Sequence, residues 1–235
     1  MTTIGLLIAG GVGSRMQNAV PKQFMTVMDK PVIIYTLEKF EKHPSIDVIA
    51  VVCLEGWENI LASYAKQYGI TKLKHIAKSG SVGQESIKNG LLELKKYYSD
   101  DDIVLVHDGN RPMVSNDIIS DCIAVTKLKG NAITCIPCQE AMLETLDSES
   151  STIQYPRENL KRTQTPHGFK LGDLLDAHKL AAEKGITNSI ASCSLMIELG
   201  KKVYFSNGSE KNIKLTTQDD IDIFKALLKG DMSDK

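Results

Sequence analysis

Short apolar runs alternate with longer amphipathic stretches through the first 130 residues of this chain. Three of the runs are rich in Val or Ile with little polar alternation, as in central parallel strands that are covered on both faces. Alternating strands and helices are typical of a doubly wound parallel sheet. The sequence therefore predicts an α/β fold with a mostly parallel sheet and with strands over residues 4–9, 47–53, 73–77, 103–107 and 132–136.

Helices are expected where apolar residues recur at helical spacing. In the segment 32–42, for example, Ile34, Leu37 and Phe40 form one apolar stripe. No repeat, low-complexity tract or linker divides the 235 residues, which fit a single domain over 1–235. The pattern predicts helices over residues 32–42, 57–68, 84–97, 116–128, 171–183 and 217–229.

The alternation is interrupted at residues 139–163, where two short alternating segments flank a polar turn at 147–151. This pattern is typical of a β-hairpin that projects from the sheet. An isolated two-stranded hairpin is only marginally stable in water, so it needs a surface to pack on. A second subunit is the simplest such surface, and we expect residues 139–163 to be the dimerisation arm of a homodimer.

The charge and hydropathy of the chain exclude some classes of partner. A net charge of −1 gives no general attraction to nucleic acid or to an anionic membrane, so anions must bind at a local cluster of cations. No stretch approaches about 18 uncharged apolar residues, and the first residues lead into a strand rather than a signal peptide. We therefore expect a cytoplasmic protein that binds neither nucleic acid nor a membrane.

The chain has five cysteines, most of which lie in apolar runs. Cys135 and Cys138 form a Cys-x-x-Cys pair, which could be redox-active or half of a zinc site. No second Cys pair or His pair in the sequence completes a tetrahedral site. Reduced, buried thiols with a structural role are the simpler interpretation.

The strand expected at 4–9 runs directly into a glycine-rich loop that carries two cations. Glycine lets backbone N–H groups approach anionic oxygens closely, and the cations add charge where those oxygens lie. The combination suggests a polyphosphate site. Its candidate residues are Ala9, Gly10, Gly11, Gly13, Arg15 and Lys22.

Two other phosphate motifs do not match this loop. A dinucleotide fingerprint needs a glycine at the position of Met16, and a P-loop needs Gly-Lys-Ser/Thr where Lys22 is followed by Gln23. A nicotinamide-dependent dehydrogenase is therefore disfavoured. A plain strand-to-helix turn with surface cations is the alternative that the loop alone leaves open.

The strand expected at 103–107 ends in His107-Asp108, followed by Arg111. Ligands of a parallel α/β sheet bind beyond the carboxyl ends of its strands, so Asp108 is well placed to hold Mg²⁺ against phosphate oxygens. The alternative is that Asp108 caps the next helix, but that helix is expected to start near Asn116, which is too distant. We expect His107 and Arg111 to orient the loop.

Two further clusters lie toward the carboxyl end of the chain. Three cations and two hydroxyls between Arg157 and Thr165 suit a phosphomonoester, although a solvated basic loop is the simpler interpretation of this segment alone. Farther on, Thr217 and Asp220 resemble a capping box and predict the start of a helix. Lys214 precedes that helix on an expected strand.

Taken together, these clusters resemble the cytidylyltransferase family that contains 2-C-methyl-D-erythritol 4-phosphate cytidylyltransferase and ribitol-5-phosphate cytidylyltransferase. The resemblance runs from residue 4 to about residue 229. The matched elements are the glycine-rich loop ending in Pro21-Lys22-Gln23, His107-Asp108 with Arg111-Pro112, Arg157 with Gln164-Thr165-Pro166, and Asn212-Ile213-Lys214.

The resemblance implies a Rossmann-like nucleotidyltransferase fold that moves a cytidylyl group from CTP to a small polyol phosphate and releases pyrophosphate. It implies Mg²⁺ bound to Asp108 and a homodimer in which Arg157 and Thr165 bind the acceptor phosphate from the neighbouring subunit. The residues that it assigns to catalysis are Arg15, Lys22 and Lys214. Those that it assigns to the nucleotide are Ala9, Gly10, Gly11, Gly13, Gly80, Ser86 and Asp108.

Several short segments are closer to the ribitol-phosphate branch, so ribitol 5-phosphate is the favoured acceptor. They are Ala9-Gly10-Gly11, Glu38-Lys39-Phe40, and Pro44-Ser45-Ile46 followed by Trp57. Methylerythritol 4-phosphate, as in isoprenoid synthesis, or another alditol phosphate is the alternative.

The chain departs from the family pattern at three places. Gly83 stands where the family has an arginine, and the end of its Thr-Pro-Gln motif reads His167. The family's Thr-Asp pair, whose carboxylate lies near the metal, falls at Ile190-Ala191 when aligned through Cys193 and at Thr187-Asn188 when aligned from Gly185. These departures motivate a second hypothesis, a nucleotide-binding homologue that has lost catalysis.

Overall fold

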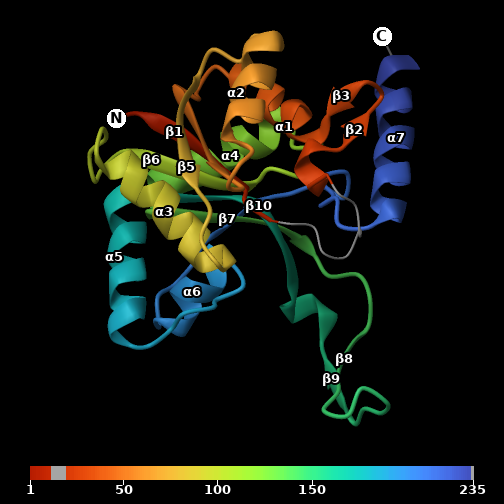
Figure 1. Cartoon of the computed structure of the whole chain (residues 1–235). Coiled ribbons are helices and arrows are strands. Elements are labelled where there is room, and N and C mark those ends of the chain that lie inside the picture. The colour runs from red at the N-terminus through yellow and green to blue at the C-terminus, as the bar shows by residue number, and fades with distance from the viewer. Residues whose placement is uncertain (12–19, 234–235) are drawn as a thin grey trace.

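The computed structural model describes residues 1–11 and 20–233. A sheet of seven strands runs through the molecule in the order β11-β7-β10-β6-β1-β4-β5 (Figure 1). Its strands in chain order are β1 (Thr3–Ala9), β4 (Val48–Cys53), β5 (Leu73–Lys78), β6 (Ile103–Asp108), β7 (Asn131–Pro137), β10 (Lys161–Lys170) and β11 (Phe205–Asn207). The five predicted strands are all present, each within one residue of its expected bounds.

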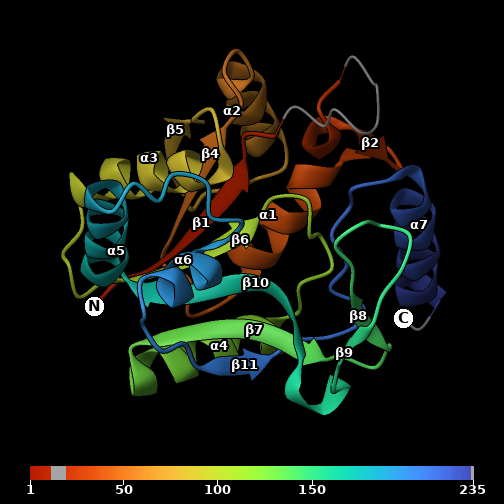
Figure 2. The ribbon, with the colours of Figure 1, turned by 90° about the horizontal axis from the view of Figure 1, so that it is seen from below.

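The sheet is mostly parallel, as predicted, with one exception. β1 pairs parallel with β4 and β6, β4 with β5, and β7 with β11. β10 is antiparallel to both β6 and β7 and lies between them (Figure 2). The interpretation of residues 157–165 as a solvated basic loop holds for its three cations, which are exposed, but residues 161–165 belong to a strand and Gln164 is buried in it.

Helices cover both faces of the sheet (Figure 1). One face packs against α1 (Val32–Lys42), α2 (Glu58–Gln67) and α4 (Asn116–Lys129). The other packs against α3 (Gly83–Lys95), α5 (Leu171–Glu183) and α6 (Ser192–Glu198). Alternate residues of the central strands point to the two faces: Leu7 and Val51 to the first, Leu6 and Val52 to the second.

The six predicted helices are present, and the last of them, α7 (Gln218–Ser233), packs beside a small ribbon of β2 (Thr26–Val27) and β3 (Lys30–Pro31). Asp220 accepts hydrogen bonds from the backbone N–H groups of Thr216 and Thr217, both at 2.7 Å, so the predicted capping box is confirmed. The strand expected around Lys214 is wrong, since residues 212–216 have no strand pairing. α6 was not predicted, because its seven residues are too few to show a clear helical period.

The predicted hairpin is present. β8 (Met142–Glu144) pairs antiparallel with β9 (Ile153–Tyr155) and extends away from the sheet (Figure 1). Its large apolar side chains are exposed to solvent; they are Met142, Leu143, Leu146, Ile153 and Tyr155. Residues 161–163 pair with β7 at the start of β10, so we call residues 139–160 the arm. Its packing on a second subunit stays a prediction.

All five cysteines are buried and unpaired. Burial raises the pKa of the Cys53 and Cys122 thiols to about 12, so both are protonated and unreactive at neutral pH. This environment agrees with the structural role expected from the sequence. In the part of the chain that the structure describes, no helix combines the length and the apolarity needed to cross a bilayer.

Candidate active site

A cavity of about 660 Å³ opens at the carboxyl ends of β1 and β6. The strand register places Asp108 directly beside Ile8, one residue before the end of β1, so the two loops that follow these strands meet there. Most of the predicted site residues line this cavity. They are Ala9, Gly10, Gly11, Lys22, Gly80, Ser86, Asp108, Thr165 and Lys214.

Three predicted site residues are not among those that line the cavity. Gly13 and Arg15 lie outside the described residues. Arg157 lies at the root of the arm, where its guanidinium donates to the Gln139 carbonyl at 3.0 Å. Arg157 and Thr165 were expected to reach the acceptor together from a neighbouring subunit. The structure differs in that Thr165 lines the cavity of its own chain.

The glycine turn is in close contact with the loop that precedes α3. A Cβ atom added at Gly10 would collide with the side chain of Ser79, whose backbone N–H is held by the Cys53 carbonyl at 2.9 Å. In the same loop, the Gly80 N–H donates to the Ser86 hydroxyl at 3.0 Å. Glycine at position 10 is therefore required by this close approach, which leaves backbone groups of both loops facing the cavity.

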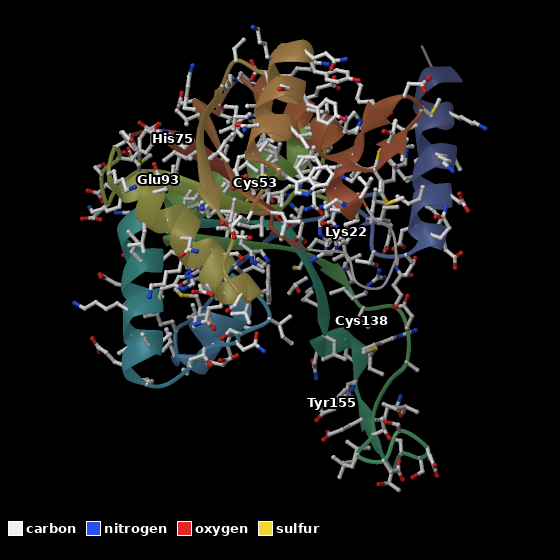
Figure 3. The ribbon with its side chains drawn as sticks, viewed as in Figure 1. Lys22, Cys53, His75, Glu93, Cys138 and Tyr155 are labelled. Carbon is white, nitrogen blue, oxygen red and sulfur yellow. The ribbon has the colours of Figure 1, made fainter. Side chains whose placement is uncertain are left out.

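Two buried side chains anchor the segment that carries Lys22. Gln23 is 2% exposed and donates to the carbonyls of Ala9 at 2.7 Å and Gly11 at 3.1 Å. Phe24 stacks on Trp57 with ring centroids 4.6 Å apart. These contacts fix Lys22 beside the glycine turn, well away from Tyr155 of the arm (Figure 3).

Asp108 lies between two cations. Its Oδ1 accepts from the Lys214 ammonium and its Oδ2 from the Arg111 guanidinium, both at 3.0 Å. Burial alone would raise the pKa of Asp108, but the two cations hold it well below its usual range. The carboxylate is therefore ionised at all ordinary pH values. It does not cap α4, because Ser115 accepts from the Ile118 N–H at the start of that helix.

His107 and Thr165 brace the loop after β6. The Thr165 hydroxyl accepts from the Asp108 N–H and lies 3.0 Å from His107 Nδ1, while His107 Nε2 lies 3.2 Å from the Arg111 carbonyl. A carbonyl can only accept, so Nε2 carries the proton and Nδ1 accepts from Thr165. Burial lowers the pKa of His107 to about 4, which keeps the ring neutral. His107 therefore positions the loop rather than carrying charge.

Lys214 is held in place by its neighbours in the chain. Asn110 and Leu215 exchange hydrogen bonds, with the Leu215 N–H to the Asn110 carbonyl at 2.9 Å. Arg111 donates to the Asn212 carbonyl at 2.8 Å, and the Asn212 amide donates to the Thr165 carbonyl at 2.9 Å. The segment is thus tied to both β6 and β10, and this places the Lys214 ammonium on Asp108.

The side chains at the cavity can be compared with the ligands that Mg²⁺ requires. Asp108 is the single carboxylate among the described residues that line the cavity, and no group of three or more His, Cys, Asp or Glu gathers elsewhere in the described chain. Mg²⁺ is commonly held by one or two carboxylates together with substrate phosphates and water. One ionised carboxylate beside the glycine turn fits that pattern, with its two oxygens bonded to Lys214 and Arg111 in this structure.

The positions where the sequence departs from the cytidylyltransferase pattern that it resembles lie at the cavity. Ile190 and Ala191 line it, whereas Thr187 and Asn188 are absent from the residues that do. The alignment through Cys193 therefore agrees with the structure. A Cβ atom added at Gly83 would meet no atom within 4 Å, so close packing does not require glycine there.

Sequence reasoning did not select several residues that line the cavity. They are Gln23, Ser79, Thr163, His167 and Ser192. Thr163 and His167 belong to β10, so recognising a strand in that polar segment would have placed them at the site. Ser192 begins a helix of only seven residues and carries no signal in the sequence.

Three buried histidines make the folded protein sensitive to acid. Burial lowers the pKa of His107, His167 and His178 to about 4, against 6.5 for an unperturbed histidine. As the pH falls, these histidines bind protons in the unfolded chain before they do so in the folded protein. The stability that the neutral histidines contribute is therefore fully present above about pH 6.5 and is lost as the pH falls toward about 4. Thermal unfolding across this range should show the decline, and His178→Leu should make it smaller. An unchanged pH profile in that variant would contradict the assignment.

Comparison with known proteins gives one consistent family. The family model described as 2-C-methyl-D-erythritol 4-phosphate cytidylyltransferase matches residues 3–230. A ribitol-5-phosphate cytidylyltransferase of Lacticaseibacillus paracasei is 42% identical over 95% of this chain and 97% of its own length. A 2-C-methyl-D-erythritol 4-phosphate cytidylyltransferase of Clostridium botulinum is 34% identical over 95% of this chain and 96% of its own.

Solved structures agree in fold. The 2-C-methyl-D-erythritol 4-phosphate cytidylyltransferase of Francisella tularensis superposes with a TM-score of 0.81 at 27% identity, covering 95% of this chain and 98% of the other. A 4-diphosphocytidyl-2C-methyl-D-erythritol synthase of Anaerococcus prevotii gives a TM-score of 0.82 at 22% identity over 97% and 96% of the two chains. The predicted α/β fold is confirmed.

Proposed function

The chain belongs to the 2-C-methyl-D-erythritol 4-phosphate cytidylyltransferase family, and we propose that it transfers the cytidylyl group of CTP to a small polyol phosphate, with ribitol 5-phosphate as the acceptor. An oxygen of the acceptor phosphate attacks the α-phosphorus of CTP, the bond to the β-phosphate breaks, and pyrophosphate leaves with the electron pair. The products are a CDP-polyol and pyrophosphate. The observation that carries the proposal is the ionised Asp108, held by Lys214 and Arg111 beside the glycine turn.

This reaction needs little acid–base chemistry, because the attacking phosphate is already an anion. The obstacle is to bring two polyanions together and to stabilise charge at the five-coordinate phosphorus, which is a matter of positioning and electrostatics. Lys22 lies on the glycine-turn side of the cavity and Lys214 on the Asp108 side. We assign both to the triphosphate and the transition state, together with Arg15 by family resemblance.

The two ends of the cavity suit different substrates. We assign the glycine turn and the loop before α3, with Gly80 and Ser86, to the nucleotide, because both line the same side of the cavity. β10 lies on the other side of β6 and brings Thr165 into the cavity. We assign this β10 side, called the acceptor half below, to the polyol phosphate.

Mg²⁺ is part of the proposal. Asp108 would hold it, and the ion would supply positive charge against the phosphate oxygens of CTP. Because the family's second carboxylate is replaced by Ile190-Ala191, we expect the bound nucleotide and water to provide the remaining ligands.

The homodimer is also part of the proposal. The arm is a two-stranded ribbon whose apolar side chains are largely exposed to solvent, such as Leu143 at 63% and Leu146 at 94%. A second copy would cover them and bring Arg157 to the partner's acceptor half. We likewise propose a cytoplasmic location, which the five unpaired cysteines support.

The proposal is tested by measuring pyrophosphate release from CTP with a panel of acceptors. Ribitol 5-phosphate should give the highest kcat/KM, ahead of 2-C-methyl-D-erythritol 4-phosphate and glycerol 3-phosphate. A higher kcat/KM for 2-C-methyl-D-erythritol 4-phosphate would instead identify that compound, used in isoprenoid synthesis, as the acceptor. Tight CTP binding with no release for any acceptor would support a homologue that has lost catalysis.

Asp108→Asn should keep the fold but raise the Mg²⁺ concentration needed for half-maximal activity by about tenfold, because the amide removes the charge that attracts the ion. A Mg²⁺ titration of the initial rate measures this. Asp101→Asn is a suitable control, since Asp101 is exposed and pairs with Lys170 at 2.7 Å away from the cavity. If Asp108→Asn and Asp101→Asn give the same titration as the original protein, Asp108 is not a metal ligand.

A further inference from the structure

Two buried polar side chains that line the cavity have an atom without a hydrogen-bond partner. His167 is 2% exposed and Ser192 is 3% exposed, and neither His167 Nε2 nor Ser192 Oγ finds a partner within the described chain. A buried polar atom left without a partner is costly, and such atoms are rare in folded proteins. Two of them at one cavity suggest that a bound molecule supplies the missing partners.

Both residues lie in the acceptor half. His167 is on β10, where it is paired in register with Val106 of β6 and Ile133 of β7. Ser192 is the first residue of α6, which packs on the same face of the sheet as Val106. The nucleotide loops follow β1 and β5 on the other side of β6. His167 is therefore separated from the glycine turn by the strand that carries Asp108. Ser192 lies on the same face of the sheet as α3, and the segment before it is tied to α3 by the Ser189 N–H, which donates to Gln84 at 2.7 Å.

The chemistry of the pair is that of a hydroxyl-binding site. Burial lowers the pKa of His167 to about 4, so its ring is neutral at physiological pH. A neutral imidazole and a hydroxyl can each donate or accept a hydrogen bond, but neither brings charge. The acceptor phosphate is assigned above to Thr165 and to Arg157 of a second copy, so the remaining need of this half is to bind the uncharged part of the acceptor. Uncharged donors and acceptors deeper in the same half match the hydroxyl groups of a polyol.

We propose that His167 and Ser192 form a hydroxyl-binding subsite that recognises the carbon chain of the acceptor. This inference rests on the proposed function, which it deepens: the two residues would select a polyol phosphate over a phosphate monoester without hydroxyls. His167 also stands where the family pattern has Gln, another side chain that both donates and accepts.

Three variants separate hydrogen bonding from packing. His167→Leu introduces an apolar side chain of similar size and removes both ring nitrogens. His167→Gln retains a hydrogen-bond donor and an acceptor. Ser192→Ala removes only the hydroxyl and leaves the packing nearly intact. His178→Leu is the matched control, because His178 is also buried with an unpartnered Nε2 but is on α5 and is absent from the residues that line the cavity.

The readout is kcat/KM for ribitol 5-phosphate and for n-pentyl phosphate, which has the same carbon chain without hydroxyls, each at saturating CTP. We expect His167→Leu and Ser192→Ala each to lower kcat/KM for ribitol 5-phosphate by about tenfold, through KM, and to leave n-pentyl phosphate and the KM for CTP within about twofold. His167→Gln should retain most of the preference, and His178→Leu all of it.

Two results would overturn the inference. Equal losses with both acceptors would mean that the residues act through packing, and a rise in the KM for CTP alone would assign them to the ribose of the nucleotide. If the original protein releases no pyrophosphate with any polyol phosphate, the proposed function fails instead. Calorimetry then decides the subsite: ribitol 5-phosphate must bind more tightly than n-pentyl phosphate, and both variants must abolish the difference.

Discussion

Lys22→Ala should lower kcat by at least ~100-fold with CTP and a saturating polyol phosphate. A preorganised cation that meets charge developing in the transition state contributes roughly 3 kcal/mol to its stabilisation. The structure gives a reason why Lys22 is held in place. The two residues that follow it, Gln23 and Phe24, are both buried and anchored. Steady-state kinetics with each substrate varied in turn measures the effect.

Two further variants sharpen this test. Lys22→Arg should restore only part of the activity, because a planar guanidinium and a compact ammonium reach phosphate oxygens differently. Lys96→Ala is the control, since Lys96 pairs with Glu93 on the solvent-facing end of α3 and should have no effect on kcat. An effect of Lys22→Ala confined to the KM for CTP would show that Lys22 binds the nucleotide without a role in the transition state.

Mixing two inactive variants, Arg157→Ala and Lys22→Ala, should restore activity if the arm completes the acceptor half of a neighbouring chain. In a mixed dimer of C₂ symmetry, one site contains both intact residues and the other contains neither. At most about half of the dimers are mixed after random exchange, so the recovered rate should approach a quarter of that of the original protein. Arg157→Ala alone should impair use of the acceptor far more than CTP binding.

The complementation experiment needs two checks. Mass spectrometry must first show that mixed dimers form. Arg162→Ala serves as the matched control, because Arg162 is on the same segment but pairs with Glu140 and Glu210 at 3.4 and 3.3 Å. If mixed dimers form and stay inactive, Arg157 acts within its own chain or has no role in acceptor binding.

The parts of the fold that sequence reasoning predicts well are those with a strong apolar period. The central strands and α1 bury Leu7, Val51 and Leu37 completely, and the same residues create the pattern from which these elements are predicted. The glycine turn and Asp108 could also be placed, because the carboxyl ends of neighbouring parallel strands meet at one edge of the sheet.

β10 shows where such reasoning stops. Gln164 is 6% exposed in the middle of a polar segment, and its burial is tolerated because its amide exchanges hydrogen bonds with Ser209, at 2.8 and 3.1 Å. Gln164 and Ser209 are 45 residues apart in the chain, so no local sequence pattern predicts that they pair. The same applies to Ser192, whose place in the cavity depends on how α6 packs on the sheet.

The position of β10, between the arm and the cavity, affects how substitutions in one part of the protein can alter another. Its ten residues join the root of the arm, at Arg157–Asn159, to Phe169 in the core, and Thr165 and His167 lie between (Figure 2). Residues 161–163 pair with β7 alone and residues 167–169 pair with both β6 and β7, and the irregularity between these two stretches contains Thr165. The arm and the acceptor half thus share one continuous segment of backbone. If the arm pairs subunits as proposed, we expect substitutions in the arm to change which polyol phosphate the active site accepts.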